Sequence, residues 1–200
     1  MLLTVSLSAA LPLSAASHVD VVKMRTENQV NPLGIGTSTP RFSWQITSDR
    51  KGVVQTSYQI LVASSREKLD RNEADLWDSG ERNSDEQLWI PYQGKALLSG
   101  AQAYWKVRIT TNRGKSEWTE PQLFTIGLLG ETKWSGTWIG LEDLQPREQK
   151  GMHTRLAARY IRKDFAAKGK VKRAVAYVAG LGVYEFYVNG QSIGDREVLR

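Results

Sequence analysis

The chain has 200 residues, enough for one or two domains, and 40% of them are hydrophobic, which excludes bulk disorder. It contains no cysteine, so disulfide bonds, thiolate metal sites and thiol nucleophiles are excluded. The net charge of +6 raises nucleic acid as a partner, but no nucleic-acid-binding motif accompanies the basic residues, so we expect no nucleic acid contact.

Residues 1–17 read MLLTVSLSAALPLSAAS, a run that has no charged side chain and ends in small residues. This pattern predicts a signal peptide, and therefore export to the periplasm or the extracellular space. The run is too short and too interrupted to span a bilayer, so we expect no membrane span. The alternative is a disordered amino terminus.

Alternating apolar and polar residues predict an all-β domain over residues 18–128. Phe42 and Trp44 share the inward face of one strand, and Trp105 lies on the inward face of another. One helical turn is expected within 65–76. The expected strands lie at 21–24, 42–46, 58–62, 76–79, 88–91, 105–109 and 123–126. About seven short strands joined by turns are typical of an immunoglobulin-like sandwich.

Residues 129–156 are predicted to be a linker with a tryptophan-rich segment, in which Trp134 and Trp138 lie beside glycines. We expect these two side chains to pack between domains rather than to form a surface patch. Residues 157–200 are predicted to hold the first strands of a second β-sandwich, at 159–165 and 171–179. These strands cannot close a sandwich by themselves, so the second module is expected to be truncated.

The stretch GLGVYEFYVNGQSIGD, residues 180–195, predicts a β-hairpin closed by Asn189-Gly190. Asn-Gly favours a type I′ turn, because both central residues of that turn need a positive φ. Asn189 is a candidate to hydrogen-bond sugar hydroxyls, and Tyr184 or Tyr187 to stack on a sugar ring. The alternative roles are turn formation for Asn189 and packing for the two tyrosines.

The same stretch, GLGVYEFYVNGQSIGD, resembles the signature of the amino-terminal β-sandwich module of bacterial alpha-L-rhamnosidases. ARYIRKDF at 158–165 and VKRAVAYVAG at 171–180 are similar to parts of that module. VNPLGIGTSTPRFSW at 30–44 resembles the start of the module that precedes it, and residues 97–124 resemble the last two strands of a fibronectin type III domain. The implied fold is an immunoglobulin or fibronectin type III-like sandwich, followed by an incomplete, jelly-roll-like second sandwich.

The resemblance implies the noncatalytic front end of an inverting glycoside hydrolase that removes terminal alpha-L-rhamnose. In that family catalysis takes place in a later (α/α) barrel, so we expect this chain alone to be inactive. The implied partners are a rhamnose-containing carbohydrate and a downstream catalytic domain of the same polypeptide. Some sister modules bind rhamnose in part through a calcium ion, but the matching motifs place no calcium ligand, so no cofactor is expected.

No catalytic or metal-binding residue is expected in the chain itself. Glycosidases need two carboxyl groups across a cleft, whereas the acids of this chain cluster in loops, with no spacing that would pair them. His18 and His153 lie beside the predicted cleavage site and in a polar loop. Two alternatives remain open: a stand-alone carbohydrate-binding or surface-adhesion module, and a basic nucleic-acid-binding module.

Overall fold

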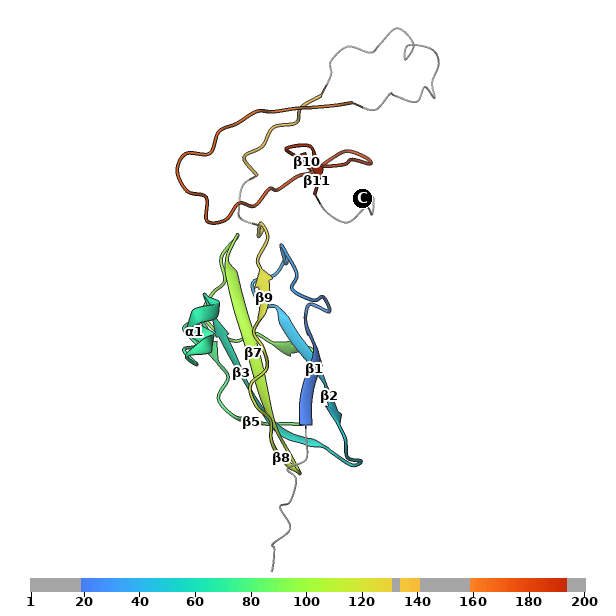
Figure 1. The fold of residues 1–200 in the computed structure, drawn as a ribbon, viewed down its shortest axis with the longest axis vertical. Coiled ribbons are helices and arrows are strands. Elements are labelled where there is room, and N and C mark those ends of the chain that lie inside the picture. Colours follow the sequence, from blue (N-terminus) through green and yellow to red (C-terminus); the bar gives the residue numbers. More distant parts are fainter. Residues whose placement is uncertain (1–18, 131–133, 141–158, 194–200) are drawn as a thin grey trace, which may run out of the picture. The chain divides into compact units, whose positions relative to one another are not determined.

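The structure is a computed structural model that describes residues 19–130, 134–140 and 159–193. The chain divides into two units, Met1–Gly136 and Thr137–Arg200 (Figure 1). The predicted signal peptide at 1–17, both histidines and residues 141–156 of the predicted linker lie outside the described residues.

Two antiparallel sheets build the first unit (Figure 1). One sheet has the order β1–β2–β6, with β1 at Val19–Thr26, β2 at Arg41–Ser48 and β6 at Ile90–Pro91. The other is built around β3 and β7, at Gln55–Ala63 and Gln102–Thr111. On β3 pair β4 (Trp77–Asp78) and β5 (Arg82–Asn83), and on β7 pair β8 (Gly114–Lys115) and β9 (Gln122–Thr125). The predicted all-β sandwich is confirmed, and all seven expected strands form.

Alternation along β2 and β7 builds the core between the two sheets, as the sequence predicts. Phe42 and Trp105 are fully buried, and Trp44 is 1% exposed. The ring of Phe42 lies 4.4 Å from that of Trp105 and 5.8 Å from that of Phe124, measured between centroids. Large aromatic side chains from both sheets therefore meet at Phe42, and their burial is the main stabilising contribution to this unit.

The tyrosine corner typical of immunoglobulin-like domains is altered. Ala103 is fully buried at the expected corner position, and Tyr104 faces the opposite side of β7. The hydroxyl of Tyr104 pairs with the side-chain amide of Gln102 rather than with the backbone. A different tyrosine, Tyr92, is 3% exposed and donates its hydroxyl hydrogen to the backbone oxygen of Lys95 at 2.7 Å.

The single helix of the described residues, α1 (Arg66–Asp70), covers the outer face of β3 and β7. Ser65 caps its start by accepting a hydrogen bond from the backbone N–H of Lys68. Leu69 is buried and packs with Leu61 and Ala63 of β3 in a small second core. The expected helical turn is confirmed, and it forms because this face of the sheet is apolar enough to bury Leu69.

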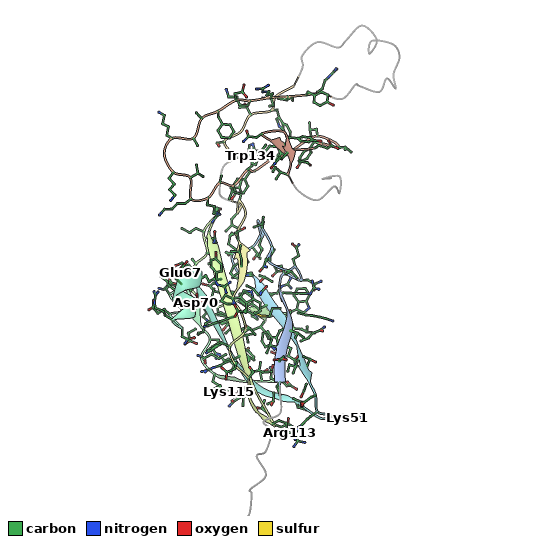
Figure 2. All side chains as sticks on the ribbon, in the orientation of Figure 1. Lys51, Glu67, Asp70, Arg113, Lys115 and Trp134 are labelled. Carbon is green, nitrogen blue, oxygen red and sulfur yellow. The ribbon has the colours of Figure 1, made fainter. Side chains whose placement is uncertain are left out.

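Two turns meet at one end of the sandwich. Asn112, after β7, donates its side-chain amide to the oxygen of Gly52 at 2.9 Å and accepts from the N–H of Val54 at 3.1 Å. Figure 2 shows Lys51 and Arg113 at this end of the unit. Some of the positive charge of the chain thus lies on exposed turns.

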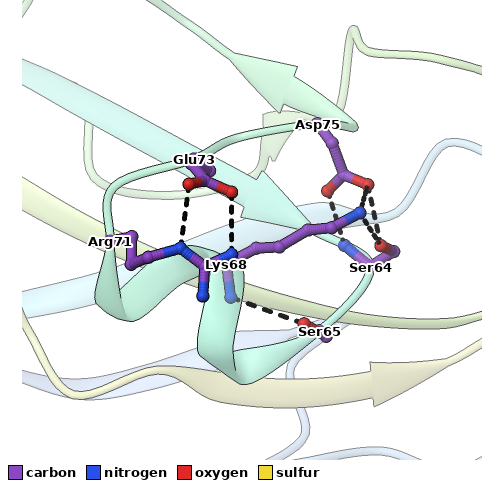
Figure 3. Close-up of polar contacts among 6 residues, drawn as sticks. All are labelled: Ser64, Ser65, Lys68, Arg71, Glu73 and Asp75. Atoms are coloured by element: carbon purple, nitrogen blue, oxygen red, sulfur yellow. Dashed lines mark hydrogen bonds and ion pairs between the residues drawn. The ribbon is translucent and has the colours of Figure 1, made fainter.

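Asp75 fixes the loop after α1 by bonding to Ser64 and Lys68 (Figure 3). Its carboxylate accepts from Lys68 Nζ at 2.6 Å, Ser64 Oγ at 2.7 Å and the backbone N–H of Ser64 at 2.9 Å. Burial raises the pKa of the Asp75 carboxyl, but these hydrogen bonds outweigh burial and hold the pKa at about 2, below the usual 3.8.

We expect Asp75→Asn to lower the free energy of unfolding by about 1 kcal/mol at pH 7. The pKa shift alone corresponds to more, but the carboxylate is 32% exposed and solvent screens the pair. Because the folded pKa lies below the unfolded one, the contribution is complete above pH 3.8 and disappears as the pH falls towards 2. Urea unfolding at a series of pH values measures it. Asp85→Asn, in an exposed loop, is the control; an equal pH-dependent loss there would contradict the assignment.

The second unit contains the predicted hairpin, formed by β10 (Tyr187–Val188) and β11 (Gln191–Ser192). Asn189 has a φ of +50° and Gly190 a φ of +79°, as a type I′ turn requires. The strands predicted at 159–165 and 171–179 are wrong for this structure, since residues 159–179 carry no strand. Phe165 is 83% exposed, so the apolar positions of this stretch face no opposing sheet among the described residues.

Candidate functional site

Tyr187 is the best-placed sugar-stacking candidate of the second unit. Its side chain is 51% exposed, and its hydroxyl donates to the carboxylate of Glu185 at 2.6 Å. Glu185 lies two residues earlier on the same face of the strand, so the pair comes from the period of two in extended backbone. Sequence reasoning missed Glu185, although the same alternation would have placed it beside Tyr187.

Tyr184 lies in a different environment. It is half-buried, and its hydroxyl donates to the backbone oxygen of Val178 at 3.3 Å. Its ring lies so close to Gly180 that a Cβ on that glycine would come within 2.4 Å of Cδ1. Gly180 is therefore needed for close backbone approach, and Tyr184 packs instead of presenting a free ring face.

Asn189 occupies the first central position of the turn and is exposed. Its left-handed backbone accounts for the choice of asparagine at this position. Of the three candidates, Tyr187 and Asn189 are exposed on the hairpin, whereas Tyr184 is not. Together with Glu185, they offer an aromatic face and hydrogen-bonding groups of the kind that sugar hydroxyls use.

The predicted loop acids are engaged in local polar contacts. Glu73 pairs with Arg71 at 2.8 Å, and the Glu81 carboxylate accepts from Ser57 at 2.8 Å. Hydrogen bonds from Arg71 and Ser57 lower the pKa of these two carboxyls, which keeps them charged. Across the part of the chain that the structure describes, no group of three or more potential ligands is arranged to hold a metal ion.

The two tryptophans of the predicted linker are both solvent-accessible in the structure. Trp134 is 50% exposed and Trp138 is 70% exposed. The indole of Trp134, labelled in Figure 2, lies against Gly136, where a Cβ would come within 2.6 Å of Nε1. Their packing between domains stays a prediction. No helix within the described ranges has the length and apolar character to cross a membrane.

The first unit is thus an immunoglobulin-like β-sandwich, and the second carries a β-hairpin with an exposed tyrosine. Residues 21–130 match the family described as Rha78A-like, N-terminal immunoglobulin domain, and the chain belongs to this family. Residues 169–199 match the alpha-L-rhamnosidase N-terminal domain. The two matches follow each other in the order that the sequence predicts.

Named relatives agree with these matches. The chain is 36% identical over 194 residues to an alpha-L-rhamnosidase of Formosa agariphila, and 35% identical over 175 residues to one of Alteromonas sp.. These alignments cover 90% and 86% of this chain but 20% and 19% of the relatives. The chain therefore spans about a fifth of the length of the relatives that it matches.

Two solved structures share the fold. The alpha-L-rhamnosidase of Streptomyces avermitilis, complexed with L-rhamnose, superposes with a TM-score of 0.58 and 36% identity over 62% of this chain and 12% of that chain. The alpha-L-rhamnosidase from Dictyoglumus thermophilum gives a TM-score of 0.57 and 36% identity over 60% of this chain and 14% of that one. The resemblance inferred from the sequence motifs is confirmed.

Proposed function

We propose that this chain is the noncatalytic amino-terminal part of an exported glycoside hydrolase that removes terminal alpha-L-rhamnose from glycans or glycosides. The observation that carries the proposal is the ordered pair of family matches, at 21–130 and 169–199, in a chain that spans about a fifth of named alpha-L-rhamnosidases. Export is supported by the uncharged, small-residue run at 1–17.

The sandwich of the first unit supports a structural role. Its interior is filled by aromatic side chains, and its acids are held by neighbouring serines, lysines and arginines rather than arranged across a cleft. Hydrolysis with inversion needs a general acid and a base several ångströms apart to leave room for water. We assign both to the catalytic domain downstream, which is the proposed partner of this region.

Contact with a rhamnose-containing carbohydrate is assigned to the hairpin of the second unit. Tyr187 supplies an exposed ring for the apolar face of the sugar, while Glu185 and Asn189 supply acceptors and donors for its hydroxyls. Tyr184 supports the hairpin through its bond to Val178.

The purified 200-residue chain is expected to show no hydrolysis of an aryl alpha-L-rhamnoside. The polypeptide continued through the downstream reading frame is expected to hydrolyse it. Release of the coloured aglycone measures both. Turnover by the short chain that is lost when one of its own acids, such as Glu81, is changed to glutamine would contradict the proposal. Binding of rhamnosides with no hydrolysis by the longer polypeptide would instead favour a stand-alone carbohydrate-binding module.

A further inference from the structure

Trp89 is an exposed tryptophan held in a strained backbone conformation. It has a φ of +58°, in the left-handed region, and it is 46% exposed. Its backbone N–H donates to Ser43 Oγ at 3.0 Å, which helps to fix this conformation. A bulky residue with positive φ is rare, and it persists only where the surrounding structure imposes it, as happens at ligand clamps.

Arg41 lies over the indole of Trp89 and is itself fixed. Its guanidinium carbon is 4.2 Å from the ring centroid of Trp89. Its Nε and Nη2 donate to the two carboxylate oxygens of Glu27 at 3.1 and 2.7 Å, and its backbone N–H donates to the same carboxylate at 2.8 Å. Three hydrogen bonds to one carboxylate pre-organise the arginine fork beside the aromatic face.

A shallow hollow continues from this pair. Glu27 lines it together with Gln29 and the loop at 32–37, and its volume is about 370 Å³. The volume lies within the range of small-molecule sites, roughly 300–1,000 Å³. Side-chain amide and carboxylate groups of the hollow therefore stand next to a flat aromatic surface, with Arg41 between them.

We propose that Trp89, Arg41 and Glu27 form a binding site for a neutral pyranoside ring, separate from the hairpin of the second unit. The C–H face of the sugar would pack on the exposed indole surface, and its hydroxyls would donate to Glu27 and accept from Arg41. The ion pair itself selects against charged ligands, because an anion competes with Glu27 for Arg41 and a cation competes with Arg41 for Glu27. The assignment of the ring as an alpha-L-rhamnoside rests on the proposed function.

The test uses the full 200-residue chain labelled with nitrogen-15, whose seven tryptophans give separate indole N–H signals. Methyl alpha-L-rhamnopyranoside and methyl alpha-D-glucopyranoside are titrated in turn. We expect a saturable shift of the Trp89 signal, identified by its absence from Trp89→Ala. Glu27→Gln should weaken the rhamnoside at least threefold. Trp138→Ala, which removes another exposed tryptophan, should leave the affinity unchanged.

The outcomes separate this site from the proposed function. If the Trp89 signal shifts with neither glycoside, the site is rejected, whatever the activity of the longer polypeptide. If binding survives in Trp89→Ala and Glu27→Gln but is lost in Trp138→Ala, the proposal is also overturned. A saturable shift with the glucoside alone supports the pyranoside site and counts against the rhamnoside as its ligand.

Discussion

Trp44→Ala is expected to lower the free energy of unfolding of the first unit by about 3–5 kcal/mol. Trp44 is 1% exposed, and its ring contacts that of Tyr58 edge-on, with centroids 5.3 Å apart. Its indole Nε1 also donates to Gln55 Oε1 at 3.0 Å. The substitution therefore leaves a large cavity and an acceptor without its donor.

Urea unfolding followed by circular dichroism measures the effect. Trp138→Ala serves as the matched control, because that tryptophan is 70% exposed and its loss should change stability by under about 0.5 kcal/mol. A loss below about 1 kcal/mol for Trp44→Ala would show that this side chain does not occupy the core in solution.

Gln55→Ala is expected to cost about 3 kcal/mol, although it removes a polar side chain. Gln55 is 2% exposed, and its amide nitrogen donates to the backbone oxygens of Ser84 and Glu86 at 3.0 and 2.9 Å. Together with the bond from Trp44, three buried or half-buried groups lose their partner. Gln45→Ala, at an exposed position of β2, is the control and should be nearly neutral.

A double-mutant cycle assigns the share of this cost that belongs to the indole. Trp44→Phe removes the donor but keeps most of the ring, and combining it with Gln55→Ala should give a coupling energy of about 1 kcal/mol. Additive losses would show that Trp44 and Gln55 stabilise the sandwich independently, and the hydrogen bond between them would then contribute nothing measurable.

The strands of the first unit were predictable because each central strand has one face fully buried. In β2 and β7 a shift by one residue would turn Phe42 or Trp105 to solvent, so the apolar pattern specifies both strand and register. The two-residue strands β5 and β8 carry no such pattern. They form because β3 and β7 offer open edges to the loops beside them.

The same reasoning failed at 159–165 and 171–179. The alternation there is genuine, but a strand forms only against a partner, and periodicity records which face would be buried rather than what would bury it. The hairpin at 187–192 was predictable because its turn is encoded locally by Asn189 and Gly190, without help from distant residues.

The candidate sites were predictable only in part. Residue type pointed to Tyr184 and Tyr187 alike, while the structure separates them, with one packed on Gly180 and the other exposed beside Glu185. Trp89 lay within an expected strand, and nothing in the local sequence reveals its positive φ or the arginine above its ring. Both depend on Arg41 and Glu27, which lie far from Trp89 in sequence.

The pairing of β3 with β7 sets how fast the first unit can fold. Gln59 and Arg108, which bond across this pairing, are 49 residues apart in sequence. The chain must close a long loop before these contacts repay its entropy, and sandwiches of this contact order fold in roughly milliseconds to seconds. The hairpin of the second unit closes through two residues and forms within about 1–10 μs. During refolding, the quickest element of the chain is thus one that contributes little to its final stability.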